Sequence, residues 1–315
     1  MNPALSIIIF TTASGAGYGL LAWYGLMLAF SGMPGGRVVA LVVLPLALLL
    51  VTGGLLSSTL HLGRPERAWR ALSQWRTSWL SREGVCSFAT YVPAGLLTLA
   101  WIVSPQPGVV AVVLGLVAAF ASLATIYCTA MIYASLKTVH QWYNPYVMPN
   151  YLALGLYTGA LLLAATLHLF GHGSQSVDLI VLIAGFAALV GKLSYWHFIA
   201  TTRHPSSPES ATGLGPLGKV RLFEAPHTEE NYLMREMGFT IARKHAEKLR
   251  ALSLVALFAA PLALVLIAIL TGGVAAATAA VIAVPLAALG VLVERWLFFA
   301  EARHVVTLFY GAEAA

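Results

Sequence analysis

Residues 38–60 read VVALVVLPLALLLVTGGLLSSTL, a run without a charged side chain. A helix that crosses a lipid bilayer needs about 20 consecutive, mostly apolar residues. Seven further apolar stretches fit this length, at residues 5–30, 85–103, 109–136, 151–170, 177–200, 251–270 and 274–297. Their apolar residues are continuous rather than alternating, which excludes a membrane β-barrel. The sequence therefore predicts an all-α polytopic membrane bundle of eight transmembrane helices, with residues 1–315 in one transmembrane domain.

The composition of the whole chain supports this fold. The chain is 59% hydrophobic and 10% charged, whereas about a quarter of the residues of a soluble domain are charged. The N-terminus has no basic segment and no cleavage site, so we expect the first apolar stretch to stay in the membrane. The two cysteines, Cys86 and Cys128, are too few for an iron–sulfur cluster, which needs about four thiolates. We expect them to be buried structural thiols.

The basic residues predict the orientation of the bundle. Sixteen of the 18 Lys and Arg fall on the side of the N-terminus, which we call side A. Arg37 alone falls on the opposite side, side B, and Lys192 lies within a helix. Because short cytoplasmic loops of membrane proteins carry an excess of basic residues, side A and both termini are expected in the cytoplasm. The expected location is the bacterial inner (cytoplasmic) membrane, with multiple spans.

Residues 64–84 form the first long connection on side A. They combine five arginines with three tryptophans, which favour the headgroup boundary of a bilayer, so we expect an interfacial loop or helix. His61 and Glu83 each lie beside an apolar helix end, where an unpaired ionisable group is expensive and often functional. Reduction of a quinone consumes two protons. A histidine and a carboxylate therefore suit quinone binding and proton relay at this position.

Lys192, within the sixth apolar stretch, has three interpretations. It either extends to the cytoplasmic surface, pairs with Glu294, or donates to a quinone carbonyl. Glu294 and Arg295, near the end of the eighth stretch, also indicate an internal ion pair.

Four histidines gather on side A: His61, His140, His197 and His304. Two of them, on different helices, could ligate a b-type haem. Histidine is also tolerated at helix ends near water without a special role, so both interpretations stay open.

Residues 201–250 form the longest connection on side A. Their mixed charges and scattered aromatic side chains suit either a solvated linker with a surface helix or a docking surface for a cytoplasmic partner. The docking residues that we expect are Arg67, Arg70, Glu224, His227 and Tyr232. The sequence contains no P-loop, dinucleotide fingerprint or catalytic triad, so no catalytic residue is predicted, and no nucleic-acid partner.

The motif His61-Leu62-Gly63-Arg64-Pro65-x-Arg67-Ala68, followed by Ser81-x-Glu83, resembles the anchor subunit of dimethyl sulfoxide reductase-type complexes. The resemblance implies two partners, a molybdopterin catalytic subunit and an iron–sulfur subunit, which hold those cofactors. It also implies that the anchor exchanges electrons with ubiquinone or menaquinone. His61 and Glu83 match the histidine and glutamate implicated in quinol binding. We therefore place the quinone site around His61, Arg64 and Glu83, with Lys192 as a further candidate.

The orientation of the chain separates it from the dimethyl sulfoxide reductase itself, whose catalytic side faces the periplasm. A basic side A and a long 201–250 segment look more like the cytoplasm-facing, sulfite-oxidising members of this family. The expected function is therefore transfer of electrons from the iron–sulfur subunit to quinone, in a complex that oxidises sulfite. The anchor alone is not expected to act on the soluble substrate.

Three other functions remain as alternatives. The chain could be a quinol-oxidising anchor of a dimethyl sulfoxide reductase-like complex, a secondary transporter, or a scaffold without redox work. A transporter gains no support, because the sequence has no internal repeat and its ionisable residues lie mostly towards helix ends.

Overall fold

A computed structural model of the chain describes residues 1–60, 62–224, 227, 229, 231–237 and 241–314, and for residues 241–244 it describes the backbone only. The long helices are α1 (Leu5–Phe30), α2 (Gly36–Thr59), α3 (Trp79–Val103), α4 (Gly108–Ala134), α5 (Val147–Leu169), α6 (Gln175–Thr201), α9 (Ile241–Ser253), α10 (Ala260–Thr271) and α11 (Gly273–Ala300). The short elements are η1 (Pro65–Gln74), α7 (Pro208–Thr212), η2 (Gly215–Leu217), α8 (Tyr232–Met237), the π-helical turn η3 (Leu254–Ala259) and η4 (Val305–Tyr310).

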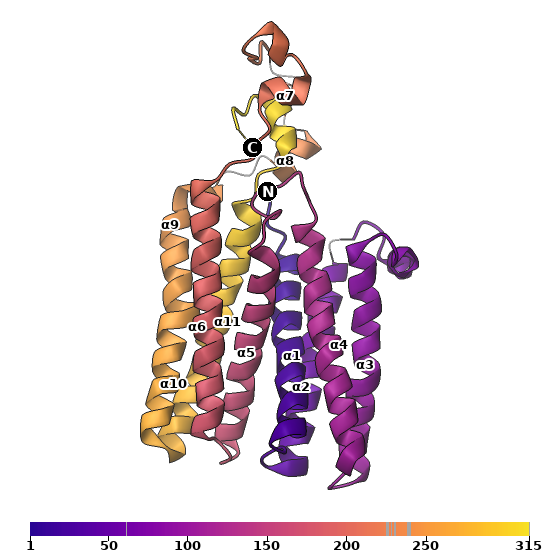
Figure 1. Cartoon of the computed structure of the whole chain (residues 1–315), viewed down its shortest axis with the longest axis vertical. Helices are drawn as coiled ribbons and strands as arrows, with labels where there is room; N and C mark the ends of the chain where they lie inside the picture. The colour runs from indigo at the N-terminus through magenta and orange to yellow at the C-terminus, as the bar shows by residue number, and fades with distance from the viewer. Residues whose placement is uncertain (61, 225–226, 228, 230, 238–240, 315) are drawn as a thin grey trace.

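Eight helices of the described chain are long and apolar enough to cross a membrane, which confirms the predicted fold class. They are α1 to α6, the continuous helix His245–Thr271 that α9, η3 and α10 form together, and α11. Figure 1 shows them side by side, with both chain termini at one end, which is side A. The α-amino group of Met1 donates to the carbonyl oxygen of Ala302 at 2.8 Å, so the two ends of the chain are in contact.

Two helices extend further into the polar connections than the apolar stretches predicted. The third span begins at Trp79 rather than residue 85, so Glu83 lies inside α3. The seventh helix begins at Ile241, ten residues before the predicted span. Residues 241–250 contain good helix formers and neither Gly nor Pro, so helix propensity continues where hydropathy falls. The 201–250 connection is correspondingly shorter than predicted.

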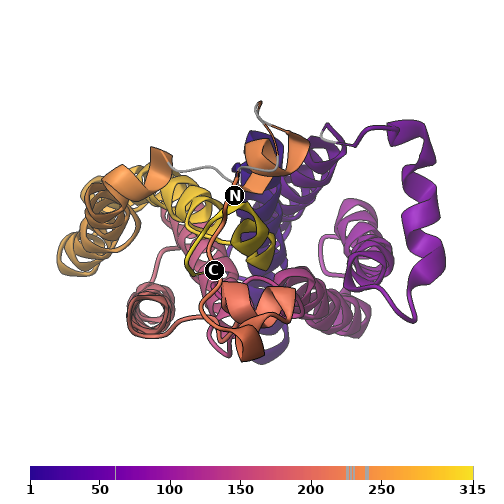
Figure 2. The same cartoon turned by 90° about the horizontal axis from the view of Figure 1, so that it is seen from above.

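Helix α1 occupies the centre of the bundle. It packs against α2, α4, α5 and α11, and α3 reaches the rest of the bundle through α2 and α4. Seen from side A, α1 to α4 form one half of the molecule and α5 to α11 the other (Figure 2). The first helix of the chain therefore joins both halves.

Glycines allow α1 to approach its neighbours at backbone distance. A Cβ atom built on Gly19 would lie 1.9 Å from the carbonyl oxygen of Gly155 on α5. A Cβ atom on Gly25 would lie 2.0 Å from the carbonyl oxygen of Gly115 on α4. Lipid tails are as apolar as the helices, so close packing of small residues is a main source of helix association in membranes.

The π-helical turn η3 faces α11 and α5. The carbonyl oxygen of Leu257 in this turn accepts a hydrogen bond from the Tyr157 hydroxyl at 2.9 Å. Gly290 on α11 lies directly against Leu257, since a Cβ atom on Gly290 would be 2.3 Å from its backbone nitrogen. The wider turn is thus bonded on one side and in close contact on the other.

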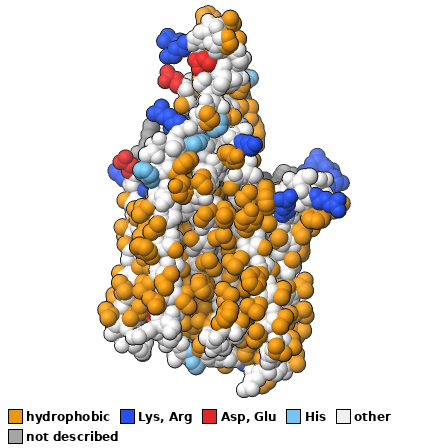
Figure 3. Space-filling view, viewed as in Figure 1, with side chains coloured by type: hydrophobic (Ala, Val, Ile, Leu, Met, Phe, Trp, Pro, Cys, Tyr) orange, Lys and Arg blue, Asp and Glu red, His pale blue; other side chains and the backbone are white. Residues whose placement is uncertain are grey.

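Polar and apolar surfaces are separated along the bundle axis. Figure 3 shows apolar side chains over the length of the bundle, with Lys and Arg concentrated on the projections at side A. An apolar wall of this length is what contact with lipid tails requires. The thiols of Cys86 on α3 and Cys128 on α4 are both free, and their sulfur atoms lie 3.9 Å apart.

We expect Gly19→Ala to destabilise the protein, because the new methyl group must displace the backbone of Gly155. Overpacking of a well-packed interior typically costs about 1–3 kcal/mol. The measurement is thermal unfolding in detergent. Gly15→Ala is the control, since a Cβ atom there meets nothing within 4 Å. Equal stabilities of the two variants would contradict the close contact of α1 and α5.

Candidate functional site

Glu83 lies in the second turn of α3 and is 5% exposed. The hydroxyl of Thr129 on α4 donates to its carboxylate. The backbone carbonyl of Glu83 accepts from Ser87 Oγ at 2.8 Å, and Ser87 Oγ lies 3.0 Å from the Tyr18 hydroxyl of α1. A single hydroxyl compensates a buried negative charge poorly. This environment suits a carboxyl group that takes up and releases protons.

The other residues of the predicted quinone site are less fully placed. His61 lies outside the described residues. Arg64 is exposed and stands immediately before η1. Among the described contacts, none joins Arg64 to Glu83. Glu83 is therefore the residue of this group whose surroundings support a functional role.

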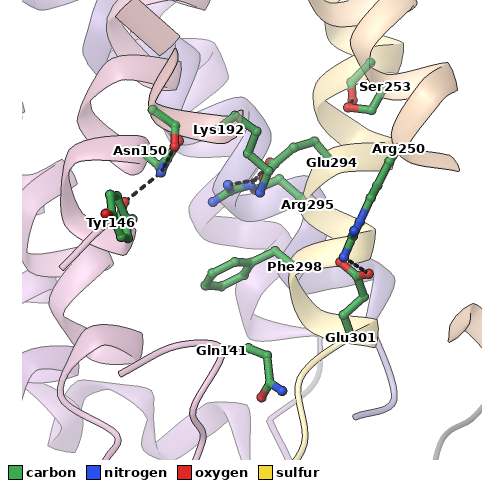
Figure 4. A network of polar contacts seen from close by, with 12 residues as sticks. Gln141, Tyr146, Asn150, Lys192, Arg250, Ser253, Glu294, Arg295, Phe298 and Glu301 are labelled. Atoms are coloured by element: carbon green, nitrogen blue, oxygen red, sulfur yellow. Dashed lines mark hydrogen bonds and ion pairs between the residues drawn. The ribbon is translucent and has the colours of Figure 1, made fainter. Parts of the chain in front are cut away.

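Lys192, Glu294 and Arg295 form a second buried cluster, 1%, 0% and 3% exposed respectively. The Lys192 ammonium pairs with the Glu294 carboxylate, which also accepts from Arg295 Nη2 at 2.7 Å (Figure 4). The pairing of Lys192 with Glu294 and that of Glu294 with Arg295 are both confirmed. The alternative in which Lys192 extends to the surface is wrong, because the carboxylate and two aromatic rings hold the ammonium inside.

Aromatic faces complete the surroundings of the two cations. The Lys192 nitrogen lies 4.1 Å from the ring centroid of Tyr195 and 5.0 Å from that of Trp196. The Arg295 guanidinium lies 4.3 Å from the ring centroid of Tyr151. Cation–π attraction of this kind partly compensates the loss of water around a buried cation.

A small polar cavity separates the two buried groups. It has a volume of about 20 Å³, and Arg295 and Tyr151 lie in its lining together with Thr129 and Tyr18. Thr129 is the residue that donates to Glu83. The cavity thus lies between the Glu83 site and the Lys192–Glu294–Arg295 cluster.

An apolar cavity of about 310 Å³ adjoins the polar one. It lies between α1, α2, α5 and α11, and it shares Thr12, Ala16, Thr158 and Val291 with the polar cavity. Most of its lining is aliphatic, for example Leu161 on α5. Such a cavity has the chemistry of a site for an apolar chain.

The candidate haem ligands are placed, apart from His61, at the side A ends of the helices. His140 Nε2 lies 2.9 Å from the Thr202 hydroxyl, and His304 Nδ1 accepts from the backbone of Val306 at 3.0 Å. Burial lowers the pKa of His140, with a further contribution from His204, and burial alone lowers the pKa of His304. His197 is exposed. The described contacts pair none of these histidines with one another, so the haem stays a prediction from sequence.

The expected docking residues are exposed on the projections of side A. Arg67 and Arg70 lie on η1, and the Arg70 guanidinium lies 5.5 Å from the ring centroid of Trp69. Glu224, His227 and Tyr232 are exposed in the connection between α6 and α9. The structure therefore leaves all five accessible to a partner.

Sequence analysis missed the residues that connect the two buried groups. Thr129, Tyr18 and Tyr151 lie on three different apolar helices, and each is an isolated polar position. The signal that was present is the unusual number of hydroxyl side chains in the first half of α1, at Thr11, Thr12 and Ser14. All three line the polar cavity.

Comparisons with known proteins show similarity along the whole chain. The family model described as DMSO reductase anchor subunit (DmsC) matches residues 1–312. One subunit of the sulfite dehydrogenase of Allochromatium vinosum is 34% identical over 343 aligned residues, which cover 100% of both chains.

Two substitutions in the buried cluster are expected to differ strongly in stability. Glu294→Gln leaves two buried cations without a carboxylate, and loss of one partner of a buried pair costs about 3–5 kcal/mol. Lys192→Met leaves the neutral Glu294–Arg295 pair and replaces the lysine by an apolar side chain of similar length. We expect it to cost less than about 1.5 kcal/mol.

Chemical unfolding of both variants in detergent measures this difference. A Glu294→Gln variant as stable as Lys192→Met would show that Glu294 does not compensate both cations.

Proposed function

Because the chain belongs to the DMSO reductase anchor subunit family, we propose that it transfers electrons between quinone and the iron–sulfur subunit of a molybdoenzyme complex. Family membership makes the chain a multi-pass membrane anchor subunit of an oxidoreductase complex. The identity to one subunit of a sulfite dehydrogenase supports a more specific assignment. In this assignment the complex oxidises sulfite, and the anchor passes the electrons to ubiquinone or menaquinone.

The observation that carries the quinone assignment is the burial of Glu83. A carboxyl group inside a membrane span is costly and is a functional candidate by default. Glu83 has one hydroxyl donor, Thr129, and no cation beside it among the described contacts. A carboxyl group in this state can hydrogen-bond a quinone oxygen and exchange a proton with it. Arg64 and His61, at the side A end of the neighbouring helix α2, complete the proposed site, and Lys192 serves as a proton relay.

The partner subunits are proposed to bind at side A. Electron transfer requires a short distance between the last cluster of the iron–sulfur subunit and the quinone, and Glu83 lies near the side A end of α3. The same side carries η1 and the connection between α6 and α9, with the exposed residues Arg67, Arg70, Glu224, His227 and Tyr232. The molybdopterin subunit would bind through the iron–sulfur subunit.

Side A is proposed to face the cytoplasm of a bacterial inner membrane. Reporter fusions after Gly213, in the α6–α9 connection, and after Gly272, between α10 and α11, test this orientation. We expect a cytoplasmic signal from the first and a periplasmic signal from the second, because the basic residues concentrate on side A. The reverse pattern would remove the basis for a sulfite-oxidising complex in the cytoplasm.

Glu83→Gln should lower quinone-linked turnover of the complex by at least about tenfold, since the amide keeps the shape but cannot exchange a proton. The measurement compares sulfite oxidation with a quinone analogue and with ferricyanide, an acceptor that bypasses the quinone site. Ferricyanide-linked turnover should be unchanged.

Glu66→Gln is the matched control, because Glu66 belongs to the same motif and its side chain is 65% exposed. If Glu83→Gln retains normal quinone kinetics, the quinone site lies elsewhere.

A further inference from the structure

The reduction of one quinone to quinol takes up two electrons and two protons. Under the function proposed above, the electrons come from an iron–sulfur cluster of the partner subunit. The protons come from water, and Glu83, at 5% exposure, has little direct contact with solvent. The polar groups buried around it indicate how protons reach it.

A large cavity opens at side A, next to the ends of α6, α9 and α11. Its volume is about 700 Å³, and its lining includes His140, Arg250, Glu301, Arg303 and Tyr310. Arg250 Nη2 and Glu301 Oε1 form an ion pair at 2.6 Å, with 27% and 10% of the side chains exposed. Water and protons can therefore reach the Glu301 carboxylate.

One indole ring connects this cavity to the buried cluster. The Arg250 guanidinium lies 5.6 Å from the ring centroid of Trp196, and the Lys192 ammonium lies 5.0 Å from the same centroid. Figure 4 shows the Arg250–Glu301 pair beside the side chains of Lys192, Glu294 and Arg295. The exposed ion pair and the buried cluster are thus neighbours rather than separate features.

Lys192 is the member of the cluster that can release a proton. The cluster holds two cations and one carboxylate, and the guanidinium of Arg295 stays protonated in proteins. When Lys192 loses its proton, the neutral Glu294–Arg295 pair remains, with its hydrogen bond at 2.7 Å. A neutral pair is favoured over a net charge in a medium of low dielectric constant. The groups that face Lys192 are Glu294 and Arg295 from α11, Tyr195 and Trp196 from α6, and Arg250 from α9.

The small polar cavity continues the path towards Glu83. At about 20 Å³ it has room for one water molecule, which needs about 10–15 Å³ and several polar partners. The hydroxyl of Tyr151, which lines this cavity, is buried and has no hydrogen-bond partner within the described chain. Buried polar atoms of this kind are usually satisfied by water. Thr129 also lines the cavity and donates to Glu83.

We propose that Lys192 carries protons from the side A cavity to Glu83. The Lys192 ammonium releases one proton, which moves through the Tyr151 hydroxyl and a water in the polar cavity to Thr129 and Glu83. Glu83 passes it to the reduced quinone. Water in the side A cavity then reprotonates Lys192 by way of Glu301. Two such transfers accompany the two electrons of one quinol, and no electron follows this route.

The test uses the whole complex, reduced with dithionite and mixed in a stopped-flow instrument with a short-chain ubiquinone or menaquinone analogue. Quinol formation is measured in H₂O and in D₂O for Lys192→Met, Lys192→Arg and Lys192→His. Methionine cannot carry a proton, and arginine keeps the charge but does not release one. Both should slow quinol formation at least about tenfold and raise the ratio of the rates in H₂O and D₂O. Histidine titrates near neutrality and should restore a large part of the rate.

Asp178→Asn is the matched control. Asp178 is a buried carboxylate of α6 that pairs with His168 at 2.9 Å near side B, away from the proposed path. It should leave the rate and the isotope ratio unchanged.

Wild-type rates in Lys192→Met and Lys192→Arg would overturn the proton route. So would slow rates without a raised isotope ratio, or without recovery in Lys192→His, since these indicate a structural role. Failure of the proposed function gives a different result: the reduced wild-type complex forms no quinol, and Glu83→Gln changes nothing.

Discussion

Direct backbone contact between α1 and its neighbours is the constraint on which the rest of the structure depends. Gly19 lets α1 approach α5 more closely than any side chain would allow. Because α1 lies this close, the hydroxyl-bearing face of its first half meets polar groups from three other helices. Thr129, Tyr151 and Arg295 reach the same small cavity only in this arrangement. The tight packing of α1 therefore creates the polar interior as well as the apolar core.

The buried charges depend on a second contact, between α6 and α11. Lys192 on α6 and Glu294 on α11 are both almost fully buried, and each would be costly alone in a membrane. Their pairing specifies how the two helices are rotated relative to each other, since a helix turned by one residue would separate the charges. A buried ion pair contributes little net stability compared with apolar side chains. Its presence here is better explained by what the charges do than by what they stabilise.

The sequence predicted the number and type of the helices because a membrane span must satisfy its own backbone, which leaves a continuous apolar run as its signature. It did not predict where helices end on side A. Residues 241–250 are helical but polar, and hydropathy does not detect them. The pairing of Lys192 with Glu294 could be proposed because few charges occur within the spans. The cavity between Glu83 and Arg295 could not, because it depends on which faces of α1, α4, α5 and α11 meet. His61, the first residue of the motif, lies outside the described residues.

The π-helical turn at Leu254–Ala259 has a consequence for how the seventh span evolved. A π turn contains one residue more than an α turn, so it corresponds to a single-residue insertion in an otherwise regular helix. Each residue of an α-helix advances the helix by about 100°. The extra residue therefore shifts the angular phase of α10 relative to α9 by about that amount, while the helix axis continues. It lets the Arg250 segment face the side A cavity, while the residues beyond the turn present a lipid-facing pattern of independent phase.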